Sequence, residues 1–187
     1  MPLKEWVRRV AESEAFDWPT HGRWGTLFLE RLESALVDPT QTLSWCGQRA
    51  DPFLWNIQHT LSDLIWEERC PRDLRLRVLA RIPQLIAAAC RNRMPSVGAF
   101  QFWESVLELY ELCGNEPDAT IVREAVFRAL VAQIEFMRDK CSELSALHGL
   151  NHLRHEGTGA VIDKVLPLLA DDDVRGYAES ARRFERP

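Results

Sequence analysis

The sequence predicts an all-α fold in which antiparallel helix pairs stack as a short right-handed solenoid or a curved helical bundle. Three observations support this fold. Apolar residues recur at helical spacing along most of the chain, no alternating run between turn residues indicates a strand, and a short pattern repeats from residue 73 onward. With 187 residues, of which 46% are hydrophobic, the chain can bury the core of a single domain spanning residues 1–187.

The N-terminal part, residues 1–70, is rich in tryptophan and irregular in the length of its loops. Three helices are expected in its first two thirds, at residues 3–15, 27–37 and 40–48. The segment 17–26 is expected to be a loop, because Pro19, Gly22 and Gly25 interrupt a continuous helix.

A long helix is expected to start at Asp51-Pro52 and to end near residue 68, because aspartate caps a helix N-terminus and proline suits its first turn. Four aliphatic residues form a core stripe at helical spacing: Leu54, Ile57, Leu61 and Leu64. A second stripe contains Trp55, His59 and Trp66. Since a helix with two apolar faces packs on both sides, we interpret these tryptophans as packing residues rather than as a ligand cage.

Further helices are expected at residues 71–92, 97–113 and 118–140, followed by three helices between 141 and 184. The helix at 71–92 should kink or break near Ala80, because Pro83 removes a helical hydrogen bond. Gly114 is expected to end the helix at 97–113 with a left-handed cap. The same helix should turn Trp103, Leu107 and Tyr110 toward the core and present an acidic side to solvent. The acidic residues are Glu104, Glu108 and Glu111.

Three segments between residues 73 and 178 share a pattern in which a turn aspartate precedes an aliphatic residue, an arginine and then small or apolar residues. The arginines are Arg77, Arg123 and Arg175, which are 46 and 52 residues apart. Helix-pair repeats are about 40 to 47 residues long. The first spacing therefore fits directly, and the second requires a small insertion.

The clearest copy of the pattern resembles a repeat of the HEAT family. Its sequence is HEGTGAVIDKVLPLLADDDVR, residues 155–175, and it is similar to the first helix, the acidic turn and the Val-Arg start of the second helix of that repeat. The resemblance covers residues 141–184 well and 71–140 more weakly. It implies HEAT-like helix pairs over 71–187, and a shape without a particular reaction.

The resemblance also implies structural roles for four charged residues. In the HEAT family the turn aspartate and the helix arginine brace one repeat against the next. These roles would belong to Asp172 and Arg175, and to Asp118 and Arg123.

Charge is distributed unevenly along the chain. The net charge is −5, and residues 1–93 hold 13 basic and 12 acidic side chains, whereas 94–187 hold 10 and 16. Proteins that bind nucleic acid usually present a basic surface, so this distribution argues against nucleic acid as a partner. The acidic half suits a basic protein partner, or contributes only to solubility.

Composition also bears on the compartment. No run of about 18 apolar residues is present, and the start MPLKEWVRRVAESEAF lacks the apolar centre of a signal peptide, so we expect a cytoplasmic protein with no membrane contact. The cysteines Cys46, Cys70, Cys90, Cys113 and Cys141 contain no CxxC pair. We therefore expect reduced packing residues rather than a disulfide framework or a zinc ribbon.

The sharpest chemical feature is a stripe of histidines, His148, His152 and His155, on one side of a helix. The motif of zinc proteases requires a glutamate after the first histidine, and Gly149 stands there. At about 1.5 Å per residue the outer histidines lie about 10.5 Å apart along the axis, so at most one i, i+4 pair could bind an ion, with further ligands from elsewhere. The same argument excludes Cys141 as a nucleophile with His148 as its base.

We therefore expect no catalytic residue, cofactor or metal, and we interpret the chain as a non-enzymatic protein-binding repeat protein. Its size, charge and fold suit a bacterial immunity protein or antitoxin that neutralises a basic toxin or effector. Candidate contact residues come from a Trp-rich loop, from the acidic helix side and from the histidine stripe: Trp18, Arg23, Trp24, Glu104, Glu108, Glu111, His148, His152 and His155.

Two alternatives remain open at this point. One is a metal-binding protein or hydrolase that uses the His148 and His152 face. The other is a HEAT-like protein of nucleic-acid binding or repair, which the charge disfavours.

Overall fold

The computed structural model describes residues 1–13, 23–91, 97–108, 118–136 and 139–185, and all regular structure in these ranges is helical. The predicted all-α fold is thus confirmed. The α-helices are α1 (Leu3–Glu12), α2 (Arg23–Ala35), α3 (Pro39–Cys46), α4 (Ala50–Ile65), α5 (Arg72–Arg91), α6 (Val97–Phe100), α7 (Phe102–Leu107), α9 (Ala119–Phe136), α10 (Lys140–Leu153), α11 (Thr158–Val165) and α12 (Asp172–Arg182). Two short 3-10 helices, η1 (Gly47–Arg49) and η2 (Leu166–Leu168), extend α3 and α11.

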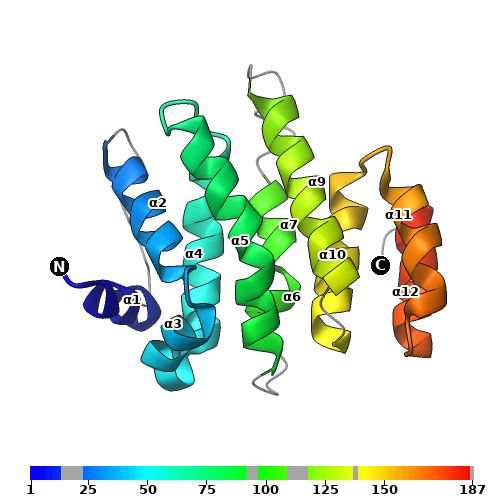
Figure 1. The fold of residues 1–187 in the computed structure, drawn as a ribbon, viewed down its shortest axis with the longest axis horizontal. Coiled ribbons are helices and arrows are strands. Elements are labelled where there is room, and N and C mark those ends of the chain that lie inside the picture. Colours follow the sequence, from blue (N-terminus) through cyan, green and yellow to red (C-terminus); the bar gives the residue numbers. More distant parts are fainter. Residues whose placement is uncertain (14–22, 92–96, 109–117, 137–138, 186–187) are drawn as a thin grey trace.

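The helices lie in a row from the N-terminus to the C-terminus and form two layers (Figure 1). In one layer α2, α5, α9 and α11 each contact the next, and in the other α1, α4, α7, α10 and α12 do the same. Successive long helices therefore alternate between the layers. Short helices α3 and α6 pack beside α4 and α5.

One hydrophobic cluster runs between the two layers along the whole row, from Trp6 to Ala181. Helix α4 contributes the predicted stripe, and its four aliphatic side chains are all fully buried. A helix that contacts neighbours in both layers buries more than one face, which is why α5 and α10 are buried around much of their circumference.

The aromatic stripe of α4 has two different environments. Trp66 is buried, and its Nε1 donates a hydrogen bond to the carbonyl oxygen of Val106 at 2.9 Å, so the packing interpretation is confirmed there. It is wrong for Trp55, which is 44% exposed. Trp55 lines a groove together with Glu104 of α7.

Three local predictions are corrected by tertiary contacts. Helix α5 continues through the buried Pro83, so the break expected as one of two outcomes near Ala80 is wrong; α2, α3 and α9 pack along this helix. Asp51 lies within the first turn of α4 and accepts a hydrogen bond from the N–H of Gly98 at 3.1 Å, so it links α4 to α6 rather than capping α4. The expected helix at 97–113 is divided into α6 and α7, and its cap at Gly114 lies outside the described residues.

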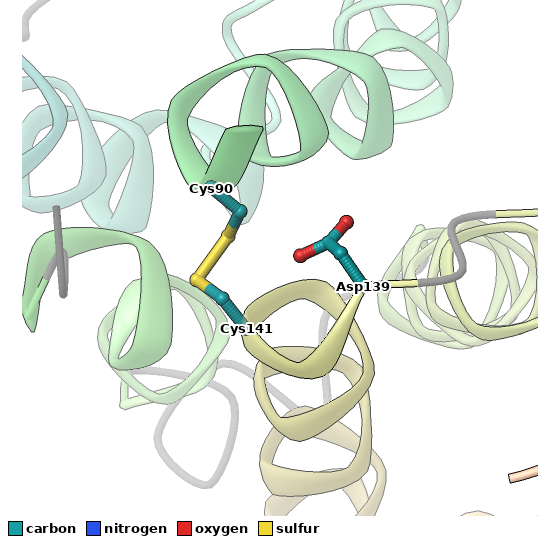
Figure 2. Close-up of side chains that lie close together, drawn as sticks. All are labelled: Cys90, Asp139 and Cys141. Atoms are coloured by element: carbon teal, nitrogen blue, oxygen red, sulfur yellow. A yellow bond between two sulfur atoms is a disulfide. The ribbon is translucent and has the colours of Figure 1, made fainter. Parts of the chain in front are cut away.

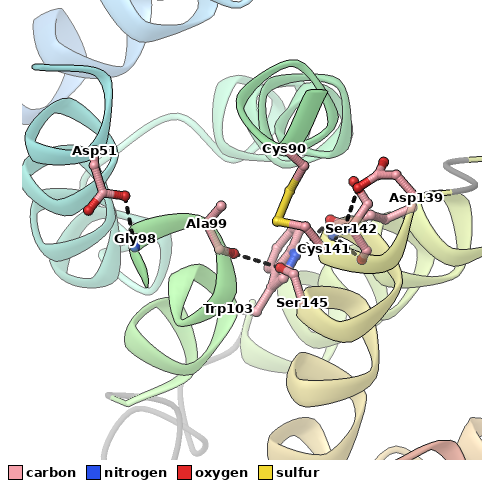
Figure 3. The surroundings of a disulfide bond; sticks show 10 residues. Asp51, Cys90, Gly98, Ala99, Trp103, Asp139, Cys141, Ser142 and Ser145 are labelled. Atoms are coloured by element: carbon pink, nitrogen blue, oxygen red, sulfur yellow. Dashed lines mark hydrogen bonds between the residues drawn. A yellow bond between two sulfur atoms is a disulfide. The ribbon is translucent and has the colours of Figure 1, made fainter. Parts of the chain in front are cut away.

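The expectation of reduced cysteines is wrong for one pair. Cys90, near the end of α5, forms a disulfide with Cys141 in the first turn of α10 (Figure 3). The two residues are 51 positions apart in sequence, and spacing alone does not show that the two helix ends meet. Cys46 and Cys70 are free and buried, and burial raises the pKa of the Cys46 thiol to about 12.

Across the described ranges, none of the helices combines the length and the apolar character needed to span a lipid bilayer.

Candidate functional site

A groove of about 570 Å³ lies between α4, α7, α9 and α10. Helix α4 contributes Trp55 and His59, whose rings are in edge contact with centroids 4.7 Å apart. Both side chains are exposed, and their i, i+4 spacing places them on one side of α4. The remaining walls are more polar and contain Gln101, Glu104, Ser105, Leu107, Glu108, Arg123, His152, Leu153 and Arg154.

A cluster of one carboxylate and two imidazoles forms part of this groove. Glu104 of α7 approaches both histidines of α10: its Oε2 is 3.0 Å from His148 Nε2, and its Oε1 is 3.7 Å from His152 Nε2. One ligand atom from each of the three residues lies within 4.8 Å of the others. The sequence places the two histidines together, and only the fold adds Glu104.

His148 is held from three sides. Its Nδ1 is 2.6 Å from the hydroxyl oxygen of Tyr177 on α12, its Nε2 faces Glu104, and its ring stacks on Phe100 with centroids 4.5 Å apart. Only 5% of His148 is exposed. The imidazole is therefore fixed in orientation, whereas His152 remains open to the groove.

The cluster has a distinct electrostatic character. Burial and the neighbouring His148 lower the pKa of His152, and the Glu104 carboxylate opposes that shift. Burial and Glu104 raise the pKa of Tyr177 to about 12, so its hydroxyl keeps its proton at neutral pH. The lowered pKa favours the neutral form of His152, so this imidazole and the protonated phenol of Tyr177 are available for hydrogen bonding.

Gly149 explains how Glu104 reaches the histidines. A Cβ on this glycine would lie 2.7 Å from the Cβ of Trp103 and 2.5 Å from Cδ2 of Leu130. Only a residue without a side chain permits so close an approach of α10 to α7 and α9. Trp103 directly precedes Glu104, so this contact places the carboxylate beside His148.

The third histidine of the stripe belongs to another environment. His155 stacks on Phe127 with centroids 3.9 Å apart, and its Nε2 is 3.3 Å from a carboxylate oxygen of Glu124. The stripe therefore does not act as one unit, as its axial spacing predicts.

Of the four residues suggested by the repeat pattern, Asp118 and Arg123 contact another helix, whereas the contacts of Arg175 described below lie within residues 169–175. Asp118 accepts a hydrogen bond at 2.6 Å from the buried Arg75 of α5. Arg123 Nη2 donates to the carbonyl oxygens of Leu153 and Arg154, at 3.2 and 3.0 Å, and so ties α9 to the end of α10. Arg175 donates to the carbonyl oxygen of Leu169 at 2.6 Å, and its ion pair with Asp172 lies within α12.

Charged contacts between α10 and α12 come from neighbours of Asp172. Lys140 Nζ lies 2.9 Å from Asp171 Oδ2 and 3.0 Å from Asp173 Oδ2. Asp171 also caps α12, because its carboxylate accepts hydrogen bonds from the N–H groups of Asp173 and Val174.

A second group of possible ligands surrounds the disulfide. Asp139, the N-cap of α10, points toward the sulfur atoms of Cys90 and Cys141, and the three ligand atoms lie within 4.8 Å of one another (Figure 2). The disulfide occupies both sulfur atoms, so they are not thiolates in this state.

The remaining candidates lie elsewhere or outside the described residues. Arg23 and Trp24 open α2, with the guanidinium 5.1 Å from the indole centroid, and they line a separate hollow with Thr26, Leu27 and Glu30. Trp18 and Glu111 lie outside the described residues.

Tyr177 and Phe100 were not predicted as neighbours of His148, and Trp55 was interpreted as a packing residue. One available signal was the shared i, i+4 spacing of the Trp55 and His59 pair and the two histidines of α10. The contact with Tyr177 depends on how α12 packs on α10, for which the sequence offers no signal.

Comparison with protein-family models, curated proteins and solved structures found no match to this chain.

Proposed function

We propose that this chain is a non-enzymatic HEAT-like helical-repeat protein, with right-handed stacking of its helix pairs, that binds a basic protein partner. A bacterial immunity protein or antitoxin that covers a basic toxin is the type of protein we propose. The observation that carries this proposal is the groove, in which the exposed Trp55 stands together with Glu104 and Glu108.

This groove has the chemistry that a basic side chain requires. A partner's arginine could stack its guanidinium on the Trp55 ring and pair with Glu108, which is exposed in the same groove. Tryptophan and a charged pair of this kind are frequent centres of binding energy in protein interfaces. Arg123 is less available to repel such a cation, because it donates hydrogen bonds to the end of α10.

Two wider features support the same class. The acidic C-terminal half would speed association with a basic partner through long-range attraction. Helices that alternate between two layers form a long surface, and such a surface can bind a protein without any catalytic residue. We keep the cytoplasm as the proposed location, although a disulfide such as Cys90–Cys141 is rare in a reducing compartment.

The test is capture of partners from the native organism, followed by titration of the purified partner. We expect one basic protein whose affinity falls at least tenfold with Glu108→Arg and with Trp55→Ala. The affinity should also fall as salt increases, because the attraction is electrostatic.

Two matched controls are available outside the groove. Glu156→Arg reverses an exposed charge after α10, and Trp24→Ala removes an exposed tryptophan on α2. Both should leave the affinity unchanged. If Trp24→Ala abolishes binding and the groove variants do not, the groove is not the binding surface; an acidic partner would contradict the proposed class.

A further inference from the structure

We propose that Glu104, His148 and His152 form a binding site for a zinc ion, with one coordination position open to the groove. This inference concerns a ligand that the proposed partner binding does not require, and its test needs no partner protein. Two histidines and one glutamate are a ligand set used by zinc sites that keep an open position.

The ligand spacing suits a tetrahedral ion. Donor atoms about 2.05 Å from a tetrahedral zinc lie about 3.3 Å from one another. Glu104 Oε2 is 3.0 Å from His148 Nε2, and Glu104 Oε1 is 3.7 Å from His152 Nε2, so each imidazole lies near one carboxylate oxygen at close to that spacing. The three ligand atoms lie within 4.8 Å of one another, so small side-chain rotations suffice to close the site.

The two histidines are presented together by α10. Residues four apart on a helix lie on the same side, and both Nε2 atoms approach the same carboxylate. Their rings are in edge contact, with centroids 4.6 Å apart. The third ligand comes from α7, whose distance from α10 is set by Gly149.

Tyr177 and Phe100 supply the outer support that a metal-binding histidine requires. A ligating imidazole usually donates its second N–H to an oxygen, which fixes its tautomer. His148 Nδ1 is 2.6 Å from the Tyr177 hydroxyl, and the ring stacks on Phe100. A buried imidazole held in this way loses little conformational freedom when an ion binds.

Binding changes the hydrogen bonds of this network in a defined manner. In the tautomer that carries its proton on Nε2, His148 donates to Glu104 and accepts at Nδ1 from the Tyr177 hydroxyl. With metal, the Nε2 lone pair binds the ion, the ring proton is carried on Nδ1, and the Tyr177 oxygen accepts it. Starting from that neutral tautomer, binding moves a proton from one ring nitrogen to the other, and no proton has to leave the imidazole.

The donor set also selects the class of metal. Imidazole nitrogen favours zinc and other late first-row metals, whereas magnesium and calcium take oxygen ligands. The fourth position faces the groove that His152 and Glu104 line, so water or a side chain of a bound protein can complete the coordination.

The experiment is a zinc titration of the untagged, unreduced protein after removal of metal with a chelator. Keeping the Cys90–Cys141 disulfide intact prevents its sulfur atoms from binding zinc. We expect one zinc per chain by calorimetry and by elemental analysis after dialysis. Cobalt substitution should produce the visible absorption bands of a tetrahedral nitrogen and oxygen site.

Three variants remove the site in steps. His152→Ala deletes a partly exposed ligand and should lower zinc affinity at least 100-fold with little change in folding. Glu104→Gln keeps the size of the side chain and removes its charge, so it should also lower zinc affinity. Tyr177→Phe should lower affinity about 10- to 100-fold, as loss of an outer hydrogen bond to a ligand does.

His59→Ala is the matched control, since His59 is an exposed histidine of the same groove and is not part of the cluster. It should bind zinc as the unaltered protein does. The proposal is overturned if the unaltered protein binds less than one zinc per chain, or if His59→Ala lowers affinity as much as His152→Ala. Circular dichroism of each variant separates loss of ligation from loss of folding.

Discussion

Gly149 of α10 lies in direct contact with Trp103 of α7, so closely that a Cβ on the glycine would be 2.7 Å from the Cβ of Trp103. The indole of Trp103 is fully buried, and its Nε1 donates a hydrogen bond to Gln133 Oε1 at 2.9 Å. Gln133 in turn donates to the carbonyl oxygen of Ser142 at 2.9 Å. Helices α7, α9 and α10 therefore pack closely around the Trp103 indole.

Gly149→Ala is expected to destabilise the fold. The added methyl group must displace buried Trp103 or Leu130 atoms, which costs about 1–3 kcal/mol of unfolding free energy. Urea denaturation measures this cost. Gly176→Ala in α12 is the matched control: nothing lies within 4 Å of its Cβ position, so the helix should gain about 0.5–1 kcal/mol. Equal effects of the two substitutions would contradict the packing argument.

Asp118→Ala is expected to cost about 3 kcal/mol of unfolding free energy, because it leaves the buried Arg75 guanidinium without its carboxylate. Arg75 is 1% exposed and also donates to the carbonyl oxygen of Ile65 at 2.9 Å. The matched change, Asp172→Ala, removes an exposed carboxylate paired within its own helix and should cost less than about 1 kcal/mol. A larger effect at Asp172 than at Asp118 would reverse this assignment of bracing roles.

Replacement of Cys90 by serine is expected to lower the unfolding free energy by up to about 4 kcal/mol, the loop-closure value for a cross-link over 51 residues. Reduction of the unaltered protein should have the same effect and should not affect the variant further. Mass spectrometry after alkylation of the unfolded, unreduced protein checks the bond itself. Labelling of Cys90 and Cys141 under those conditions would show that the pair is not oxidised.

Lys140→Met is expected to raise the pKa of Asp171 toward its ordinary value. The hydrogen bond from Lys140 holds that pKa low, with further help from the N–H of Val174. Since the folded pKa is the lower one, the stabilisation is present above the unfolded pKa of about 3.9 and is lost as pH falls through the folded value. Because the variant lacks the Lys140–Asp171 pair, its unfolding free energy should fall less on acidification than that of the unaltered protein.

Carboxyl NMR titration of Asp171 measures the shift directly. Lys164→Met is the matched control, because Lys164 pairs with Glu135 on another part of the surface. An Asp171 pKa that is the same with and without Lys140 would refute the expected coupling.

Helical periodicity was sufficient to predict most helices, since the apolar stripe of α4 recurs at the spacing that one buried face requires. Predictions made from single residues were less successful. Pro83 does not break α5 and Asp51 does not cap α4, because contacts with neighbouring helices outweigh a local preference of a few kcal/mol.

Half of the candidate site could be predicted from the sequence. The i, i+4 spacing of His148 and His152 places them on one side of a helix, and the requirement for further ligands from elsewhere was also evident. The identity of those neighbours was not, because Glu104 is 44 residues from His148 and Tyr177 is 29 residues from it.

The sequence by itself determined the all-helical fold, the buried faces of the helices and the pairing of two histidines, because these depend on residues within a few turns of one another. Only the tertiary structure decided that Glu104 completes the histidine cluster, that Trp55 is exposed in a groove and that Cys90 meets Cys141. Each of these depends on which helices pack together, and close packing at residues such as Gly149 sets those distances.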